Sequence, residues 1–309
     1  MFRSILVPLD GSAMAEQAIV PAGDTARRLG ALLSLAVVHP WGAREDAPFA
    51  GTEADRELRE TEDRYLGELS RRVGSTFNIP VEAALLEGEP VPALATFAAA
   101  RGVDLVVSST HGRGAVARAL RGSVALRLAH AVACPALLVK PLRESTAIPD
   151  PDGFIRILVP LDGTTRAETS LESAIALAAS RQVLIYLVRV VAPFETNGSW
   201  EASRYLNRIA ARLEERGLRV DCRVIARSSV EDAIVGLAAR LDVDLLALTT
   251  RTRGEGERML LGSVADGAVQ RASMPVLVCH PNRRESSAEA TGGAAASLPV
   301  PLWPVPLPA

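Results

Sequence analysis

The stretch Ser109-Thr110-His111-Gly112, followed after nine residues by Gly122-Ser123, decides how the rest of this chain is interpreted. It lies between a short β-branched run at 103–107, which is typical of a buried strand, and a helical pattern that begins at Ser123. Glycine allows a close backbone approach, and serine is a common residue at a helix N-terminus. A glycine-rich loop that ends at a helix N-terminus presents backbone N–H groups and a positive dipole end, which favours an anion and most often a phosphate.

A weaker copy of this arrangement occurs later in the chain. Thr249-Thr250-Arg251-Thr252 follows an apolar run, and Gly262-Ser263 comes after the same gap of nine residues. The opening segment Val7-Pro8-Leu9-Asp10-Gly11 recurs in the same way as Val159-Pro160-Leu161-Asp162-Gly163. Two copies of one pattern indicate two copies of one domain. We therefore expect domain one at 1–142, a linker at 143–153, domain two at 154–281 and a disordered Pro- and Ala-rich tail at 282–309.

Composition narrows the class of protein. The 309 residues carry a formal net charge of −2, with 48% hydrophobic and 23% charged residues, which is an ordinary globular balance. No basic excess points to a nucleic acid or an anionic membrane, and no apolar run is long enough to span a bilayer. Three scattered cysteines offer neither a disulfide framework nor a metal-ligand spacing. We expect a cytoplasmic protein with no nucleic-acid or membrane partner.

Strand-like and helical patterns alternate strictly within each domain. In domain one, buried strands are predicted near 4–9, 32–38, 81–86, 103–107 and 135–139, and helices at 15–29, 56–73, 91–100 and 123–133. This order predicts a doubly wound, Rossmann-like α/β fold in each domain, with a five-stranded parallel sheet flanked by helices. The last strands, Pro135–Val139 and Pro275–Cys279, would otherwise be open apolar edges. We expect them to pair with each other, so that one chain forms an internal pseudo-dimer, with a further homodimer as an option.

Of two familiar phosphate-binding motifs, the Walker loop is excluded and the dinucleotide fingerprint is disfavoured. A Walker loop requires a lysine before the final Ser or Thr, and neither Ser123 nor Ser263 has one. The letters of a dinucleotide fingerprint occur at 112–117, but they follow the fourth strand and do not open a helix at once.

The whole pattern resembles the universal stress protein family. The resemblance rests on the V-P-L-D strand end, a G-x-P turn after the third strand, the T-H-G motif with its G-S partner nine residues on, and the V-L-V-type last strand. It covers both domains and leaves only the linker and the tail outside. The family fold is Rossmann-like, of the adenine nucleotide alpha hydrolase-like type, and ATP-binding members carry G-x-x-G, nine residues, then G-[ST].

Carried over to these residues, the resemblance implies an ATP site in domain one. Pro8, Leu9 and Asp10 would border adenine and ribose, and Val37 would pack on the base. The phosphate cradle would consist of Ser109, His111, Gly112, Gly122, Ser123 and Val124. Ser109 replaces the first glycine, and because serine is small we expect binding to survive. ATP, with Mg²⁺, is the implied cofactor, and we give His111 a positioning role.

Domain two departs further from the family pattern. Its matching residues are Pro160, Asp162, Val190, Thr249, Gly262, Ser263 and Val264. Thr249 and Thr252 replace the leading glycines, and a β-branched residue disfavours a positive φ. Arg251, Arg253 and Arg258 are either compensating phosphate donors or solvated surface charges. Whether this domain binds nucleotide stays open at this point.

Several interpretations compete for function. Asp10 and Asp162 are either ribose acceptors or simple turn residues in Asp-Gly pairs. The favoured function is nucleotide-dependent conformation or partner binding in a stress response. The alternatives are a slow ATPase or nucleotidyl-transferring enzyme on the same fold, and a scaffold that binds no nucleotide. We expect no catalytic residue and no metal ligand from the protein itself.

Overall fold

The computed structural model describes residues 2–39, 51–110, 124–140, 153–178, 183–194, 197–250 and 263–280. The predicted linker up to residue 152 and the tail lie outside these ranges. The first repeat contains strands β1 Ser4–Leu9, β2 Leu32–His39, β3 Val81–Glu87, β4 Leu105–Ser109 and β5 Ala136–Val139, and helices α1 Ala13–Glu16, α2 Ile19–Leu29, α3 Glu53–Phe77, α4 Pro90–Ala100 and α5 Val124–Ala131. The second contains strands β6 Arg156–Pro160, β7 Leu184–Val191, β8 Arg219–Ala226, β9 Leu245–Thr249 and β10 Val276–Cys279, and helices α6 Thr165–Leu177, α7 Gly198–Glu214, α8 Val230–Arg240 and α9 Ser263–Arg271.

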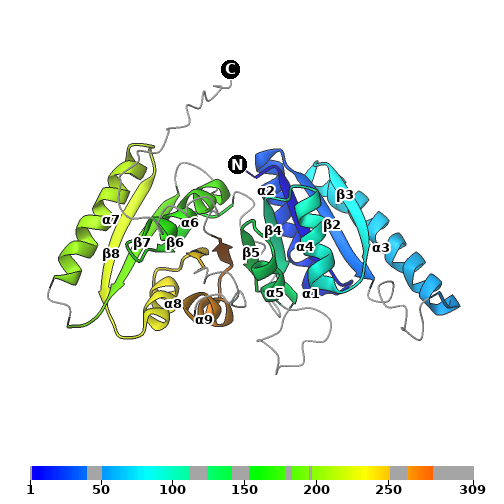
Figure 1. The fold of residues 1–309 in the computed structure, drawn as a ribbon. Coiled ribbons are helices and arrows are strands. Elements are labelled where there is room, and N and C mark those ends of the chain that lie inside the picture. Colours follow the sequence, from blue (N-terminus) through cyan, green and yellow to red (C-terminus); the bar gives the residue numbers. More distant parts are fainter. Residues whose placement is uncertain are drawn as a thin grey trace, which may run out of the picture.

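The strands form one sheet in the order β3-β2-β1-β4-β5-β10-β9-β6-β7-β8 (Figure 1). Within each repeat all pairings are parallel, which confirms the predicted doubly wound fold. β5 and β10 pair antiparallel, with Leu137 opposite Leu277, so the predicted pairing of the two last strands is also confirmed. The order reverses between β1 and β4 and again between β6 and β9, and such switch points open a crevice at the carboxyl ends of the strands.

Helices cover both faces of the sheet. One face packs against α1, α2, α3, α6 and α7, and residues of both repeats, such as Val7 and Val159, lie fully buried there. The other face packs against α4, α5, α8 and α9, with Leu6 and Leu158 fully buried. Side chains of a strand alternate between faces, so a nearly unbroken apolar strand such as β1 supplies both layers of core.

The first helical segment of the chain differs from the prediction. We expected one helix over 15–29, but α1 ends at Glu16 and α2 begins at Ile19. Pro21 lies in the first turn of α2 and has no N–H to donate to the carbonyl of residue 17, so the helical ladder is broken there. The second repeat has Ser173 at the matching position, and its helix α6 runs unbroken.

Side chains near β5 and β10 reach across the boundary between the repeats, which we call the seam. Lys140 Nζ donates to the carbonyl oxygens of Gln270 and Ala272 at 3.1 and 3.2 Å, at the end of α9. At the matching position, His280 Nε2 donates to the Ala129 oxygen of α5 at 2.6 Å. Each interaction places a polar donor at the negative end of a helix in the other repeat. In each repeat, the residue that follows the last strand thus forms hydrogen bonds to a helix end of the other repeat.

Candidate functional site

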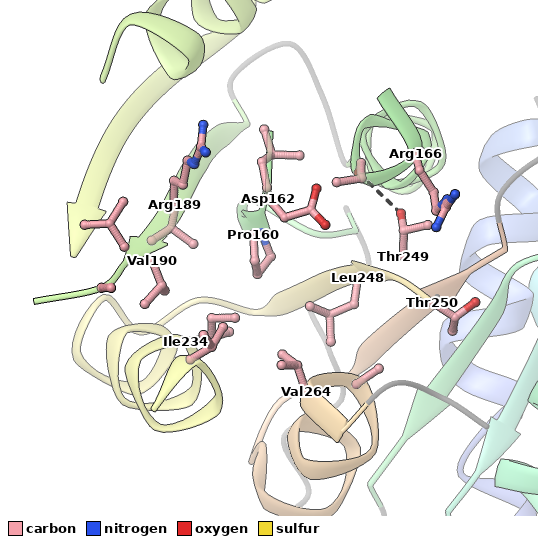
Figure 2. Close-up of a pocket in the computed structure, with 17 residues that line it drawn as sticks. Pro160, Asp162, Arg166, Arg189, Val190, Ile234, Leu248, Thr249, Thr250 and Val264 are labelled. Atoms are coloured by element: carbon pink, nitrogen blue, oxygen red, sulfur yellow. Dashed lines mark hydrogen bonds between the residues drawn. The ribbon is translucent and has the colours of Figure 1, made fainter. Parts of the chain in front are cut away.

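A cavity of about 320 Å³ lies at the carboxyl ends of β6, β7 and β9 (Figure 2). It occupies the switch point of the second repeat, where open α/β sheets bind ligands. The sequence-predicted residues that line it are Pro160, Asp162, Val190, Thr249 and Val264. Five positions chosen from motifs far apart in the chain therefore surround one space.

The cavity has an apolar wall and a polar edge. Val188, Val190, Ile234 and Leu248 form much of the wall, and they come from β7, α8 and β9. The polar edge consists of Asp162, Arg166, Arg189, Thr249 and Thr250. A largely apolar cavity with a few convergent polar groups is the usual form of a small-molecule site. Two arginines against one carboxylate favour an anionic ligand.

Asp162 shapes the turn between β6 and α6. Its Oδ1 accepts from Thr164 N at 3.0 Å and from Thr164 Oγ1 at 2.6 Å, and Thr164 in turn caps α6 by accepting from Ala167 N. Asp10 does the same in repeat one, where Oδ1 accepts from Ser12 N at 3.0 Å and Ser12 Oγ at 2.6 Å. Both aspartates thus shape the turn that follows their strand, and Asp162 also lines the cavity.

Thr249 ends β9 at the position of Ser109 in the first repeat. Its Oγ1 donates to the Ala167 oxygen at 3.3 Å, which connects the strand end to the first turn of α6 (Figure 2). Ser109 is itself buried at the end of β4. A small polar residue therefore ends this strand in both repeats, and in repeat two it lines the cavity.

Most of the predicted phosphate loop falls outside the described residues. His111, Gly112, Gly122 and Ser123 of repeat one and Gly262 of repeat two lie there. The helices that should follow are present: α5 begins at Val124, which is 41% exposed, and α9 begins at Ser263. The N-terminus of α9 borders the cavity through Val264 and Ala265.

The remaining predicted residues of repeat one are arranged as follows. Pro8 and Leu9 are buried, and Asp10 is exposed at the end of β1. Val37 is buried on β2, beside Leu9 in the strand register.

Strand register changes how the two repeats correspond. Ala36 pairs with Pro8 in repeat one, and Val188 pairs with Pro160 in repeat two. Arg189 therefore stands at the position of Val37, and Val190 at the position of Val38. Val38 packs with the face that contains Leu6, as Val190 does, whereas Val37 belongs to the opposite core. The two valines that sequence reasoning matched are thus one residue out of register.

Sequence reasoning missed Arg166 and Arg189. Arg189 interrupts the otherwise apolar β7, LIYLVRVV, and this interruption was a readable signal. Arg166 lies in the first turn of α6 and carried no distinctive spacing. Among the described residues, no cluster of three His, Cys, Asp or Glu side chains could hold a metal ion. The described helices also include none that is long and apolar enough to cross a membrane.

The chain folds as a tandem doubly wound α/β protein, with a cavity at the carboxyl ends of the strands of its second repeat. Residues 1–140 and 153–280 each match the universal stress protein family, so the chain belongs to that family.

Known relatives agree with this assignment. Universal stress protein Rv2005c of Mycobacterium tuberculosis is 29% identical over 67% of this chain and 71% of its own length. A universal stress protein of Mycolicibacterium smegmatis is 27% identical over 90% of this chain and 97% of its own. The crystal structure of a universal stress protein from Archaeoglobus fulgidus superposes with a TM-score of 0.72, at 19% identity, over 90% of this chain and 98% of that one.

One smaller solved member, a universal stress protein, is in complex with cAMP. It is 25% identical over 46% of this chain and 98% of its own, with a TM-score of 0.36.

Proposed function

We propose that this universal stress protein is a cytoplasmic ATP-binding protein that acts in a stress response through nucleotide-dependent conformation or partner binding. The observation that carries the proposal is the cavity of repeat two, where Pro160, Asp162, Val190, Thr249 and Val264 converge. Sequence reasoning expected repeat one to be the better site. The cavity makes repeat two an equally good candidate for the nucleotide site, because an open space remains at its strand ends although Thr249 replaces the first glycine of the motif.

Each part of a nucleotide has a suitable neighbour in this cavity. The apolar wall of Val188, Val190 and Leu248 suits a purine face. Asp162 lies at the rim, where a carboxylate accepts from ribose hydroxyl groups. The N-terminus of α9 borders the same space, and its N–H groups and dipole favour phosphate.

A magnesium ion fits this site only as part of the nucleotide. Among the described residues that line the cavity, Asp162 is the one carboxylate, and Mg²⁺ in nucleotide sites keeps most of its waters and phosphate ligands. The ion would therefore enter with the triphosphate. Its role would be to neutralise phosphate charge.

Calorimetric titration of ATP with Mg²⁺ tests the proposal. The informative variant is Asp162→Asn, because the amide oxygen can still accept from Thr164 and keep the turn, while the negative charge is lost. A hydrogen bond to a charged group contributes about 1.5–3 kcal/mol, so we expect the Kd to rise by about 10- to 100-fold. Asp10→Asn is the matched control in repeat one.

The outcomes separate the two repeats. Weakening only in Asp162→Asn supports the cavity described above, and weakening only in Asp10→Asn moves the site to repeat one. If folded wild-type protein, freed of any nucleotide carried through purification, does not bind ATP, the nucleotide proposal is wrong and the scaffold alternative stands. Hydrogen exchange with and without ATP then tests whether binding changes conformation.

A further inference from the structure

Arg189 distinguishes the cavity of repeat two from the matching place in repeat one. Strand register puts it where repeat one has the buried Val37. The neighbouring strand residues Val188 and Val190 are apolar in a largely buried strand. Placing a guanidinium at the end of such a strand costs desolvation free energy, which only an interaction with a charged or polar partner can offset.

The side chain has a defined place beside the turn that carries Asp162. A Cβ atom built on Gly163 would lie 2.9 Å from Arg189 Nη1, so the guanidinium lies directly against this turn. Its Cζ also lies 5.5 Å from the ring centroid of Tyr205, in a cation–π contact. Figure 2 shows Arg189 rising from β7 beside the segment that carries Asp162.

Tyr205 contacts the guanidinium of Arg189 through its ring and carries no negative charge that would neutralise it. Burial and the nearby Glu168 carboxylate raise the pKa of Tyr205 above its usual range, so the hydroxyl stays protonated. The hydroxyl donates to Glu168 Oε1 at 3.1 Å, and Arg212 Nη2 donates to Glu168 Oε2 at 2.7 Å. Glu168 is thus occupied by other donors. Within the described part of the chain, no carboxylate forms an ion pair with Arg189.

The result is an oriented cation next to the carboxylate proposed to accept from ribose. Arginine binds phosphate through two parallel N–H donors, and a fixed guanidinium loses less entropy when it does so. In dinucleotide folds an acidic residue accepts from the ribose 2′-hydroxyl group, and where that oxygen carries a phosphate an arginine nearby accommodates it. Repeat one has Val37 at this position, and a valine side chain has no donor.

We infer that the cavity of repeat two prefers adenine nucleotides that carry a phosphate on the 2′ or 3′ oxygen of the ribose, with Arg189 as the residue that selects it. Asp162 then accepts from the remaining ribose hydroxyl. This inference rests on the proposed nucleotide function and adds the class of nucleotide.

The test compares ligands that differ by one phosphate. Adenosine 2′,5′-bisphosphate, adenosine 3′,5′-bisphosphate and 5′-AMP are titrated into wild type and into Arg189→Val, which restores the residue of repeat one. We expect at least one bisphosphate to bind wild type about 10- to 100-fold more tightly than 5′-AMP does, which is the range for a charge-assisted contact. In Arg189→Val the ratio of the Kd of 5′-AMP to the Kd of that bisphosphate should fall to about one.

Arg208→Val is the control variant. Arg208 also lies over the ring of Tyr205, with Cζ 5.5 Å from the centroid, but it does not line the cavity. The affinity ratio should keep its wild-type value in this variant. A thermal melt of each variant shows that it is folded.

The failures are distinguishable. If 5′-AMP binds and neither bisphosphate binds more tightly, or if Arg189→Val leaves the ratio as it was, this inference is wrong and the proposed function stands. If none of the three nucleotides nor ATP binds, the proposed function itself is wrong.

Discussion

The seam can be tested through Lys140, the only lysine of the chain. Lys140→Met keeps the length of the side chain and removes both donations to the end of α9, at Gln270 and Ala272. Hydrogen bonds to charged groups contribute about 1.5–3 kcal/mol each, but this side chain is only partly buried and one ammonium makes both bonds. We therefore expect a loss of about 2 kcal/mol in the free energy of unfolding.

Urea unfolding and calorimetry measure this loss. An unfolding entropy of about 2.1 cal/mol/K per residue converts 2 kcal/mol into a Tm about 3–4 °C lower for a chain of this size. Arg56→Met is the control, because Arg56 makes an exposed ion pair with Glu53 within one helix and should cost less than about 0.5 kcal/mol. If Lys140→Met unfolds within about 0.5 kcal/mol of wild type, helix ends capped across the seam do not stabilise the protein as argued.

Three further predictions concern other parts of the fold. Burial lowers the pKa of His280, so the native state favours the neutral ring. The free energy of unfolding should therefore fall as the pH drops below about 6.5, the usual pKa of histidine in an unfolded chain. When urea midpoints are measured against pH, His280→Gln should show a smaller fall than wild type. His39 is fully buried, with Nε2 2.8 Å from a carboxylate oxygen of Asp55 and Nδ1 2.6 Å from one of Glu62. Because His39→Leu leaves both carboxylates without this partner, it should lower the urea midpoint more than Lys140→Met does. An equal or smaller effect would contradict this prediction. Gly163→Ala adds a Cβ at φ +94° against Arg189 and should cost about 1–2 kcal/mol in calorimetry, more than Gly30→Ala, whose added Cβ meets no atom within 4 Å.

Much of the fold could be predicted because the sequence signals are local and repeated. Apolar runs such as 4–9 and 245–248 identify strands without any knowledge of their neighbours, and two copies of one order identify two doubly wound units. The pairing of β5 with β10 followed from the cost of leaving two apolar edges open. The break between α1 and α2 could have been expected from Pro21, which removes one donor from the helical ladder.

The candidate site could be predicted only in part. Asp162 and Thr249 follow directly from motif positions, and both line the cavity. Val37 and Val190 were matched by the ends of their strands, but strand register depends on pairing with β1 and β6 and cannot be obtained from one strand alone. The position of Arg189 against Gly163 is a contact between β7 and the turn that follows β6, so it could not be predicted from the spacing of residues along the chain.

The antiparallel contact between β5 and β10 has a consequence for how this protein responds to dilution. Both edges belong to one chain, so their closure is an intramolecular event whose effective concentration is set by the connecting residues rather than by the amount of protein present. Two separate chains joined at the same edges would come apart as they are diluted, because their stability depends on protomer concentration. At this junction the ten-stranded sheet should hold together equally well at nanomolar and at millimolar concentration.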